Sequence, residues 1–112
     1  MNSIYSVKRD GPLKWLDYDI TLKTLSIKPT DHAGAEKLKG VLAQIKLTPA
    51  EDIETEYGMP TGGPPTLVLE RAEKPLGVLF KLLAEEMIDP ADYQAFSKNF
   101  PNAGAAIVPA KS

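Results

Sequence analysis

Hydrophobic and polar residues alternate between positions 13 and 28 with the two-residue period of β-strands. As far as residue 22 the apolar members of this run share one parity, and they are Leu16, Tyr18, Ile20 and Leu22. Beyond it the apolar positions shift to Leu25 and Ile27, and a strand changes face in this way only through an extra residue. The pattern predicts strand structure with a bulge, bend or break near Lys23-Thr24.

Two other segments have strand character. Residues 4–7 are rich in β-forming side chains and lead into the turn sequence Asp10-Gly11-Pro12, which predicts an N-terminal hairpin or meander. Residues 66–70 have an unbroken apolar centre, which is typical of a strand covered on both faces. We therefore expect residues 66–70 to lie inside the sheet.

A spacing of three and four residues between apolar positions predicts a helix over residues 31–46, with Thr30 or Asp31 as its N-cap. One face of this helix is apolar, and its members are Ala35, Leu38, Val41, Leu42 and Ile45. Gly34 and Gly40 each cost about 1 kcal/mol relative to alanine within a helix, so packing has to hold this helix in place.

The sequence Thr48-Pro49-Ala50-Glu51 matches a capping box with proline at the first helical position. It predicts a short acidic helix over residues 49–57 that ends at Gly58. The solvent-facing carboxylates of this helix are those of Glu51, Asp52, Glu54 and Glu56. Residues 58–65 contain three prolines and three glycines, and we expect them to form an irregular loop.

The C-terminal third reads as two helices, over residues 75–87 and 90–99, with Asp89-Pro90 as the N-terminal signal of the second. The first helix places Leu76, Leu79, Phe80, Leu83 and Met87 on one face. Val78 and Leu82 broaden that face, and the second helix adds Tyr93, Phe96 and Phe100, so these side chains are either core or an interface. The tail 102–112 is either disordered or contributes a short edge strand at 105–108.

This order of elements predicts an α+β fold: a single globular domain over residues 1–112 with an antiparallel sheet packed against helices. The length of 112 residues and the hydrophobic fraction of 43% agree with one core. The chain has no cysteine, which favours a reducing cytoplasm, and its N-terminal residues lack the apolar run of a signal peptide. We expect no membrane segment, because no stretch has the length and apolar character of a span.

Few residues offer catalytic or metal chemistry. Asp17 and Asp19 share one face of a strand, where they could hold a divalent cation or instead form a solvated polar edge. His32 with Asp31 and Glu36 is a possible metal cluster, although His32 is the only histidine and zinc sites need three or four ligands. With no nucleophile motif and no phosphate-binding glycine loop, the sequence predicts neither an enzyme nor a metal or other cofactor, and a metal-dependent enzyme is the least favoured class.

Charge is distributed unevenly, with the excess of lysine before residue 48 and the excess of carboxylates after it. The acidic helical pair disfavours a helix-turn-helix on phosphate, while Trp15 and Tyr18 among lysines leave weak nucleic-acid binding by the N-terminal half as an alternative. Another alternative is a virion-structural or assembly factor. The function that fits best is a non-catalytic protein-binding module with a regulatory or inhibitory role. Stand-alone inhibitors and adaptors, including those of phages and mobile elements, have this form.

The acidic segment and the loop after it are the expected binding site, because loops held by rigid elements commonly carry recognition. The expected contact residues are Glu51, Asp52, Glu54, Glu56, Tyr57 and Met59. Carboxylates there would meet a basic surface on a protein partner, with Tyr57 and Met59 as apolar contacts beside them.

Overall fold

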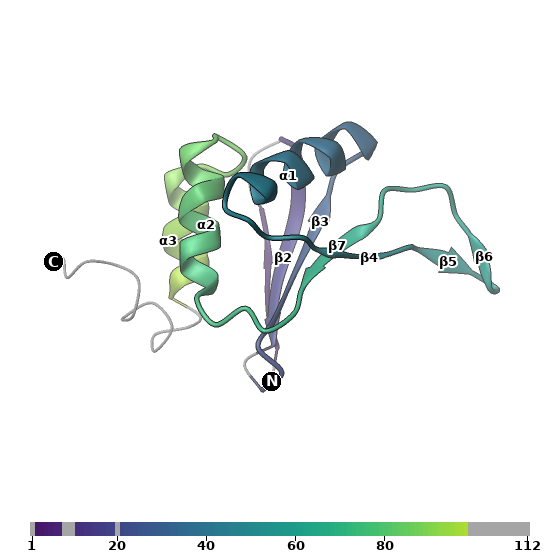
Figure 1. Ribbon diagram of the computed structural model, residues 1–112, viewed down its shortest axis with the longest axis horizontal. Coiled ribbons are helices and arrows are strands. Elements are labelled where there is room, and N and C mark those ends of the chain that lie inside the picture. The colour runs from purple at the N-terminus through teal and green to yellow at the C-terminus, as the bar shows by residue number, and fades with distance from the viewer. Residues whose placement is uncertain (1, 8–10, 20, 99–112) are drawn as a thin grey trace, which may run out of the picture.

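The computed structural model describes residues 2–7, 11–19 and 21–98, in which three strands are followed by a helix, four further strands and two helices (Figure 1). The larger sheet has the strand order β1-β2-β3-β7-β4, and β5 and β6 form a separate pair. The strands are β1 (Asn2–Ser6), β2 (Leu13–Asp19), β3 (Thr24–Pro29), β4 (Ala50–Asp52), β5 (Thr55–Glu56), β6 (Met59–Pro60) and β7 (Thr66–Leu69). The helices are α1 (His32–Gln44), α2 (Pro75–Ala84) and α3 (Pro90–Ser97).

The first three strands form an antiparallel meander, as the alternation of residues predicted. Strand structure is interrupted by a turn where the apolar positions change parity. In this turn the Asp19 carboxylate accepts hydrogen bonds from the backbone N–H groups of Thr21 and Leu22 at 3.0 and 3.1 Å. Lys23 completes this turn with a φ of 54°. The prediction that Leu22 faces the core is wrong, because the turn leaves its side chain 68% exposed, and Ile20 lies outside the described residues.

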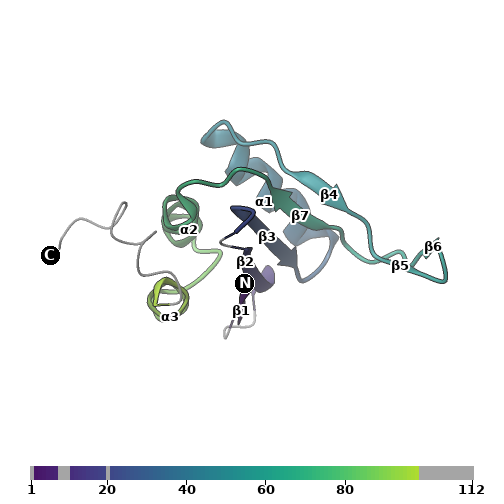
Figure 2. The same cartoon turned by 90° about the horizontal axis from the view of Figure 1, so that it is seen from below.

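All three helices lie on the same side of the five-stranded sheet (Figure 2). β7 pairs with β3 and β4, which confirms that residues 66–69 lie inside the sheet. Only one face of β7 is covered by helices, however, since Leu67 and Leu69 are buried there whereas Thr66 and Val68 are partly exposed on the opposite face. The larger sheet therefore has a covered face and an open face.

α1 begins where the sequence predicted, because the Asp31 side chain accepts a hydrogen bond from the N–H of Gly34 at 2.8 Å. It ends two residues earlier than expected, in a C-terminal motif that places Lys46 at a φ of 62°. The N–H of Leu47 donates to the carbonyl of Leu42, and that of Lys46 donates to the carbonyl of Ala43. This pair of bonds closes the helix with lysine where glycine is usual.

The predicted acidic helix over 49–57 does not form, and the prediction is wrong. Ala50–Asp52 is instead the edge strand β4, antiparallel to β7. A nine-residue helix with an apolar edge of only Ala50, Ile53 and Tyr57 gains little stability in isolation. β7 is held in place because Leu67 and Leu69 are buried in the core. Residues 50–52 supply hydrogen-bond partners for the backbone of β7, so β7, which is distant in sequence, determines that they form a strand.

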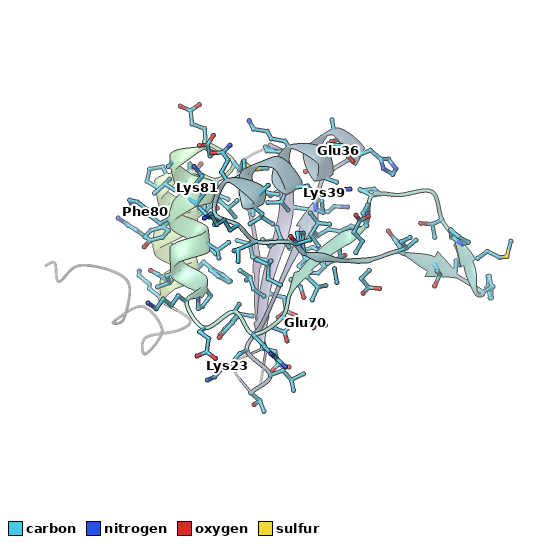
Figure 3. The ribbon with its side chains drawn as sticks, viewed as in Figure 1. Lys23, Glu36, Lys39, Glu70, Phe80 and Lys81 are labelled. Atoms are coloured by element: carbon cyan, nitrogen blue, oxygen red, sulfur yellow. The ribbon has the colours of Figure 1, made fainter. Side chains whose placement is uncertain are left out.

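Helix α3 begins at the predicted N-terminal signal, Asp89-Pro90. Asp89 caps α3 in a capping box, in which its side chain accepts from the Asp92 N–H and the Asp92 side chain accepts from the Asp89 N–H. Phe96 on α3 is fully buried. Phe80 belongs to the set that the sequence left as either core or interface, and its side chain is 59% exposed and points away from the sheet (Figure 3). Phe100 and the tail 102–112 lie outside the described residues.

A single cluster of buried side chains joins the covered face of the sheet to all three helices. The sheet contributes Leu13, Leu16, Tyr18, Leu25, Ile27, Leu67 and Leu69. Val78 and Leu82, which made the apolar arc of α2 broad, belong to this cluster, because α2 packs against the sheet, α1 and α3 at once. The Tyr18 hydroxyl also donates to the Ala72 carbonyl at 2.9 Å and ties β2 to the segment before α2. The architecture is the predicted α+β class.

Candidate functional site

The chain between β4 and β7 leaves the body of the molecule as an arm, which we define as residues 53–65. Figure 1 shows the arm extending well beyond the five-stranded sheet, with β5 and β6 at its far end. Thr55 pairs with Pro60 and Glu56 pairs with Met59, so the two strands are joined by a two-residue turn. The expectation that residues 58–65 are irregular throughout is therefore wrong, since Met59–Pro60 is a strand.

The turn at the tip of the arm explains this local hairpin. Tyr57 and Gly58 both have positive φ, at 54° and 80°. A two-residue loop with positive φ at both positions is the type I′ arrangement, whose twist matches that of the strands it joins. Gly58 adopts this conformation without strain, whereas Tyr57 adopts it at some cost. The turn holds the Tyr57 ring at the extreme end of the arm.

The arm carries apolar side chains that the fold does not cover. Tyr57 is 96% exposed, Met59 is 67% exposed and Ile53 is 56% exposed. Only two other large apolar side chains among the described residues are as open to water, namely Leu22 and Phe80. Apolar groups gathered on one projecting element are typical of a contact surface, because water exposure gives them no stabilisation.

Lys28 fastens both strands of the arm at its base. Its ammonium donates to the Glu54 carboxylate at 3.2 Å and to the Pro64 carbonyl at 2.9 Å. The Lys28 side chain is only 12% exposed, so these contacts are better shielded from water than those of a typical surface ion pair. Thr61 N–H also donates to the Glu54 carbonyl at 3.0 Å. Lys28 therefore sets the direction in which the arm leaves the sheet.

A second contact joins the arm to α1. The Nε2 atom of His32 lies 2.8 Å from the Gly62 carbonyl oxygen, which fits an N–H donated to that oxygen. His32 thus has a structural partner, and the hypothesis of a metal cluster with Asp31 and Glu36 has no support: Asp31 caps α1, while Glu36 pairs with Lys39 at 3.2 Å. Across the ranges that the structure describes, no three His, Cys, Asp or Glu side chains gather where they could hold a metal ion.

The six residues predicted to contact a partner lie along this one segment, although not on one helix face. Glu51 lies on β4 and accepts a hydrogen bond from the Lys39 ammonium at 3.0 Å. The hydrogen bonds that Lys39 donates to Glu51 and then to Glu36 raise the pKa of Lys39. Glu54 is held by Lys28. Asp52, Glu56, Tyr57 and Met59 are exposed, and the last three form the tip of the arm.

The sequence did not assign Ile53, Lys28 or His32 to this site, although His32 was a candidate metal ligand. Glu56-Tyr57-Gly58-Met59 carried a weak hairpin signal, an X-Gly pair between short β-compatible segments, but the capping box obscured it. No local sequence pattern predicts the contacts of Lys28 with the arm, because its partners lie 26 and 36 residues away.

The open face of the sheet carries the other candidate chemistry. Lys14, at the irregular pairing between Leu13 and Trp15, lines a shallow hollow of about 370 Å³ together with Trp15 and Lys28. The carboxylates of Asp52 and Glu54 line the same hollow. Asp17 lies further along β2 on the same open face, and its pKa is raised by burial and then by the charge of Asp19. Asp19 accepts the hydrogen bonds of the turn after β2, so its carboxylate has a structural role.

In comparisons with known proteins, no family model, curated protein or solved structure matches this chain. Among the helices in residues 2–7, 11–19 and 21–98, none is long and apolar enough to cross a membrane.

If Lys28 orients the arm, the Lys28→Met variant should free it while leaving the core intact. Methionine preserves most of the apolar stem but donates no hydrogen bond, so both strands of the arm lose their contact at the base. We expect backbone amides of residues 55–61 to exchange with deuterium several-fold faster, with a small change in the denaturation midpoint. The matched control is Lys37→Met, which removes an exposed lysine from α1 without touching the arm. Equal exchange in both variants would show that Lys28 does not orient the arm.

Proposed function

We propose that this chain is a non-catalytic protein-binding module, regulatory or inhibitory, which inserts the tip of the arm into a partner protein in the cytoplasm. The observation that carries the proposal is the exposure of Tyr57, Met59 and Ile53 on a projecting hairpin whose base is fastened by Lys28. Tyrosine is enriched among the residues that dominate binding energy in protein interfaces. A fastened arm also loses less conformational entropy on binding than a free loop.

Charge on the arm favours a partner with a basic surface around an apolar pocket. Glu56 is exposed directly beside Tyr57, and Asp52 is exposed at the base. Neither carboxylate forms an ion pair with a lysine or arginine of the described ranges. Glu51 and Glu54 already pair with Lys39 and Lys28, so we assign them to positioning the segment.

The alternative of weak nucleic-acid binding relied on Trp15 and Tyr18 among lysines, but Tyr18 is buried in the core. What remains on the open face of the sheet is Trp15 with Lys14 and Lys28. Two features weigh against it. The Lys28 ammonium already has two partners, and Asp52 and Glu54 would stand close to any phosphate bound in the same hollow. The arm therefore supports protein binding better than the open face supports nucleic-acid binding.

The test is to place a photo-crosslinking amino acid at position 57, express the chain in its native host and identify the protein captured. With that partner purified, we expect the double variant Tyr57→Ser with Met59→Ser to bind at least about tenfold more weakly, since each buried anchor contributes on the order of 1–2 kcal/mol. The matched control is Leu22→Ser, which removes an apolar side chain about as exposed as Met59 from the turn between β2 and β3, outside the arm.

In the same assay, a charge-reversal variant separates the electrostatic effect on the association rate from the apolar contribution to affinity. Glu56→Lys should slow association several-fold at low salt and leave dissociation nearly unchanged, because exposed charges act mainly on encounter. Reversing Glu54 is less informative, because it also breaks the contact with Lys28. Full affinity in the Tyr57/Met59 variant, or an equal loss in Leu22→Ser, would refute the arm as the binding element.

A further inference from the structure

A second hollow, of about 260 Å³, lies at the end of β4 and β7 that is remote from the arm. The turn after α1 and the segment between β7 and α2 form its walls. Three basic residues line it: Lys46 from the first wall, and Arg71 and Lys74 from the second. We call this feature the basic hollow. Figure 3 labels Glu70 and Lys23 near this end of the sheet, on the opposite side of the body from the tip of the arm.

The three cations of the basic hollow are available to a ligand. None of them forms an ion pair with another residue of the ranges 2–7, 11–19 and 21–98. Two carboxylates also line the hollow, and one of these, Glu73, pairs with Lys23 at 3.5 Å. Three cations thus face one remaining carboxylate, that of Glu70, in a chain whose net charge is −2. Clustered like charge in a concave surface attracts a counter-ion.

The inner wall of the basic hollow is apolar. Leu69 and Val78 line it with exposed fractions of 5% and 7%, and Leu47 and Ala72 are partly buried beside them. A site with an apolar wall and a cationic rim is complementary to a molecule that has both an anionic group and an apolar part. Its volume lies just below the range of about 300–1,000 Å³ that is usual for drug-sized ligands, so the apolar part is short.

We propose that the basic hollow binds a carboxylate carried on a short apolar chain. Arg71 offers the planar guanidinium that pairs with a carboxylate through two parallel hydrogen bonds, while Lys46 and Lys74 supply further charge. The same chemistry occurs in a free organic acid and at the C-terminus of a peptide that ends in an apolar residue. This site is independent of the arm, and binding at one does not require the other.

The test is an NMR titration of the full chain, labelled with ¹⁵N, using hexanoate as the probe. We expect saturable shifts confined to amides of residues 46–48 and 69–78. Hexanamide, which lacks the charge, and acetate, which lacks the apolar chain, should each bind at least tenfold more weakly. A peptide ending in a free leucine carboxylate identifies the source: tighter binding than hexanoate indicates a peptide terminus, and weaker binding indicates a free acid.

Two positions allow the charges to be removed without harming the fold. Lys46 and Arg71 have φ values of 62° and 58°, a region that glycine occupies more readily than any other residue. The double variant Lys46→Gly with Arg71→Gly should therefore unfold at the same or a higher temperature, while binding hexanoate at least tenfold more weakly. Lys37→Ala, which removes an exposed lysine of α1 outside the basic hollow, is the control and should bind normally.

The proposal fails under any of three results. The first is no saturable shift with hexanoate, and the second is equal affinity for hexanamide. The third is undiminished hexanoate binding in the Lys46/Arg71 variant.

Discussion

Replacing Phe96 with alanine is expected to lower the free energy of unfolding by about 3–5 kcal/mol, the largest effect of any single substitution considered for this chain. Phe96 is fully buried in the cluster that joins α3 to α2 and the sheet. Alanine removes the aromatic ring and leaves a cavity that the surrounding leucines fill only in part. Urea denaturation followed by far-UV circular dichroism measures the loss.

Phe80→Ala is the matched control for this prediction. Phe80 is 59% exposed on the outer side of α2, and its ring meets that of Tyr93 edge-on with 6.2 Å between the ring centroids. Loss of that contact should cost about 1 kcal/mol or less. A similar loss in both variants, or a loss below about 1 kcal/mol for Phe96→Ala, would show that α3 is not part of the cooperative core.

Gly34→Ala is expected to destabilise the protein by about 1–3 kcal/mol, although alanine is the better helix former. A Cβ atom at position 34 would lie 2.6 Å from the backbone oxygen of Pro12, and 3.3 Å from the carboxylate of Asp31 that caps α1. The Pro12 oxygen also accepts the Thr30 N–H at 2.8 Å, so it is not free to move aside. The added methyl group must therefore push the first turn of α1 away from the segment before β2.

Gly40→Ala, in the same helix, is expected to stabilise the protein rather than destabilise it. Position 40 is exposed, and no described atom lies within 4 Å of an added Cβ there beyond the helix's own backbone and the neighbouring residues. Alanine should therefore stabilise α1 by up to about 1 kcal/mol. Denaturant midpoints of the two variants test the pair, and a Gly34→Ala protein as stable as Gly40→Ala would contradict the close approach of Pro12 to α1.

The candidate site was partly predictable. Acidic residues followed by a sequence rich in glycine and proline indicated a recognition segment, and Glu56, Tyr57 and Met59 do lie at an exposed tip. The shape of the segment was not predictable, because the capping box in Thr48-Pro49-Ala50-Glu51 satisfies the same local rules whether or not a helix follows. Two of the predicted carboxylates, Glu51 and Glu54, proved to be paired with lysines distant in sequence.

The basic hollow had no signature in the sequence. Its cations come from segments 25 residues apart, and the intervening chain is acidic, so composition indicated an acidic C-terminal half. Only the packing of the α1 turn beside the start of α2 brings Lys46 together with Arg71 and Lys74.

The sequence alone determined the features whose causes lie within a few residues. The caps at Asp31 and Asp89, the helical spacing of α1 and α2, and the change of parity near Lys23 each depend on hydrogen bonds or side-chain periodicity inside one element. Such local preferences are present in the chain before it folds, and the tertiary structure has only to agree with them.

The tertiary structure alone decided the features that depend on contacts between residues distant in sequence. Residues 50–52 form an edge strand because they pair with β7, and Phe80 is exposed although Leu79 and Leu82 of the same helix are buried in the core. Gly34 and Gly40 are equivalent by helix propensity, yet only Gly34 faces the Pro12 carbonyl. In each case the deciding contact joins residues distant in sequence, and no local pattern of side chains encodes it.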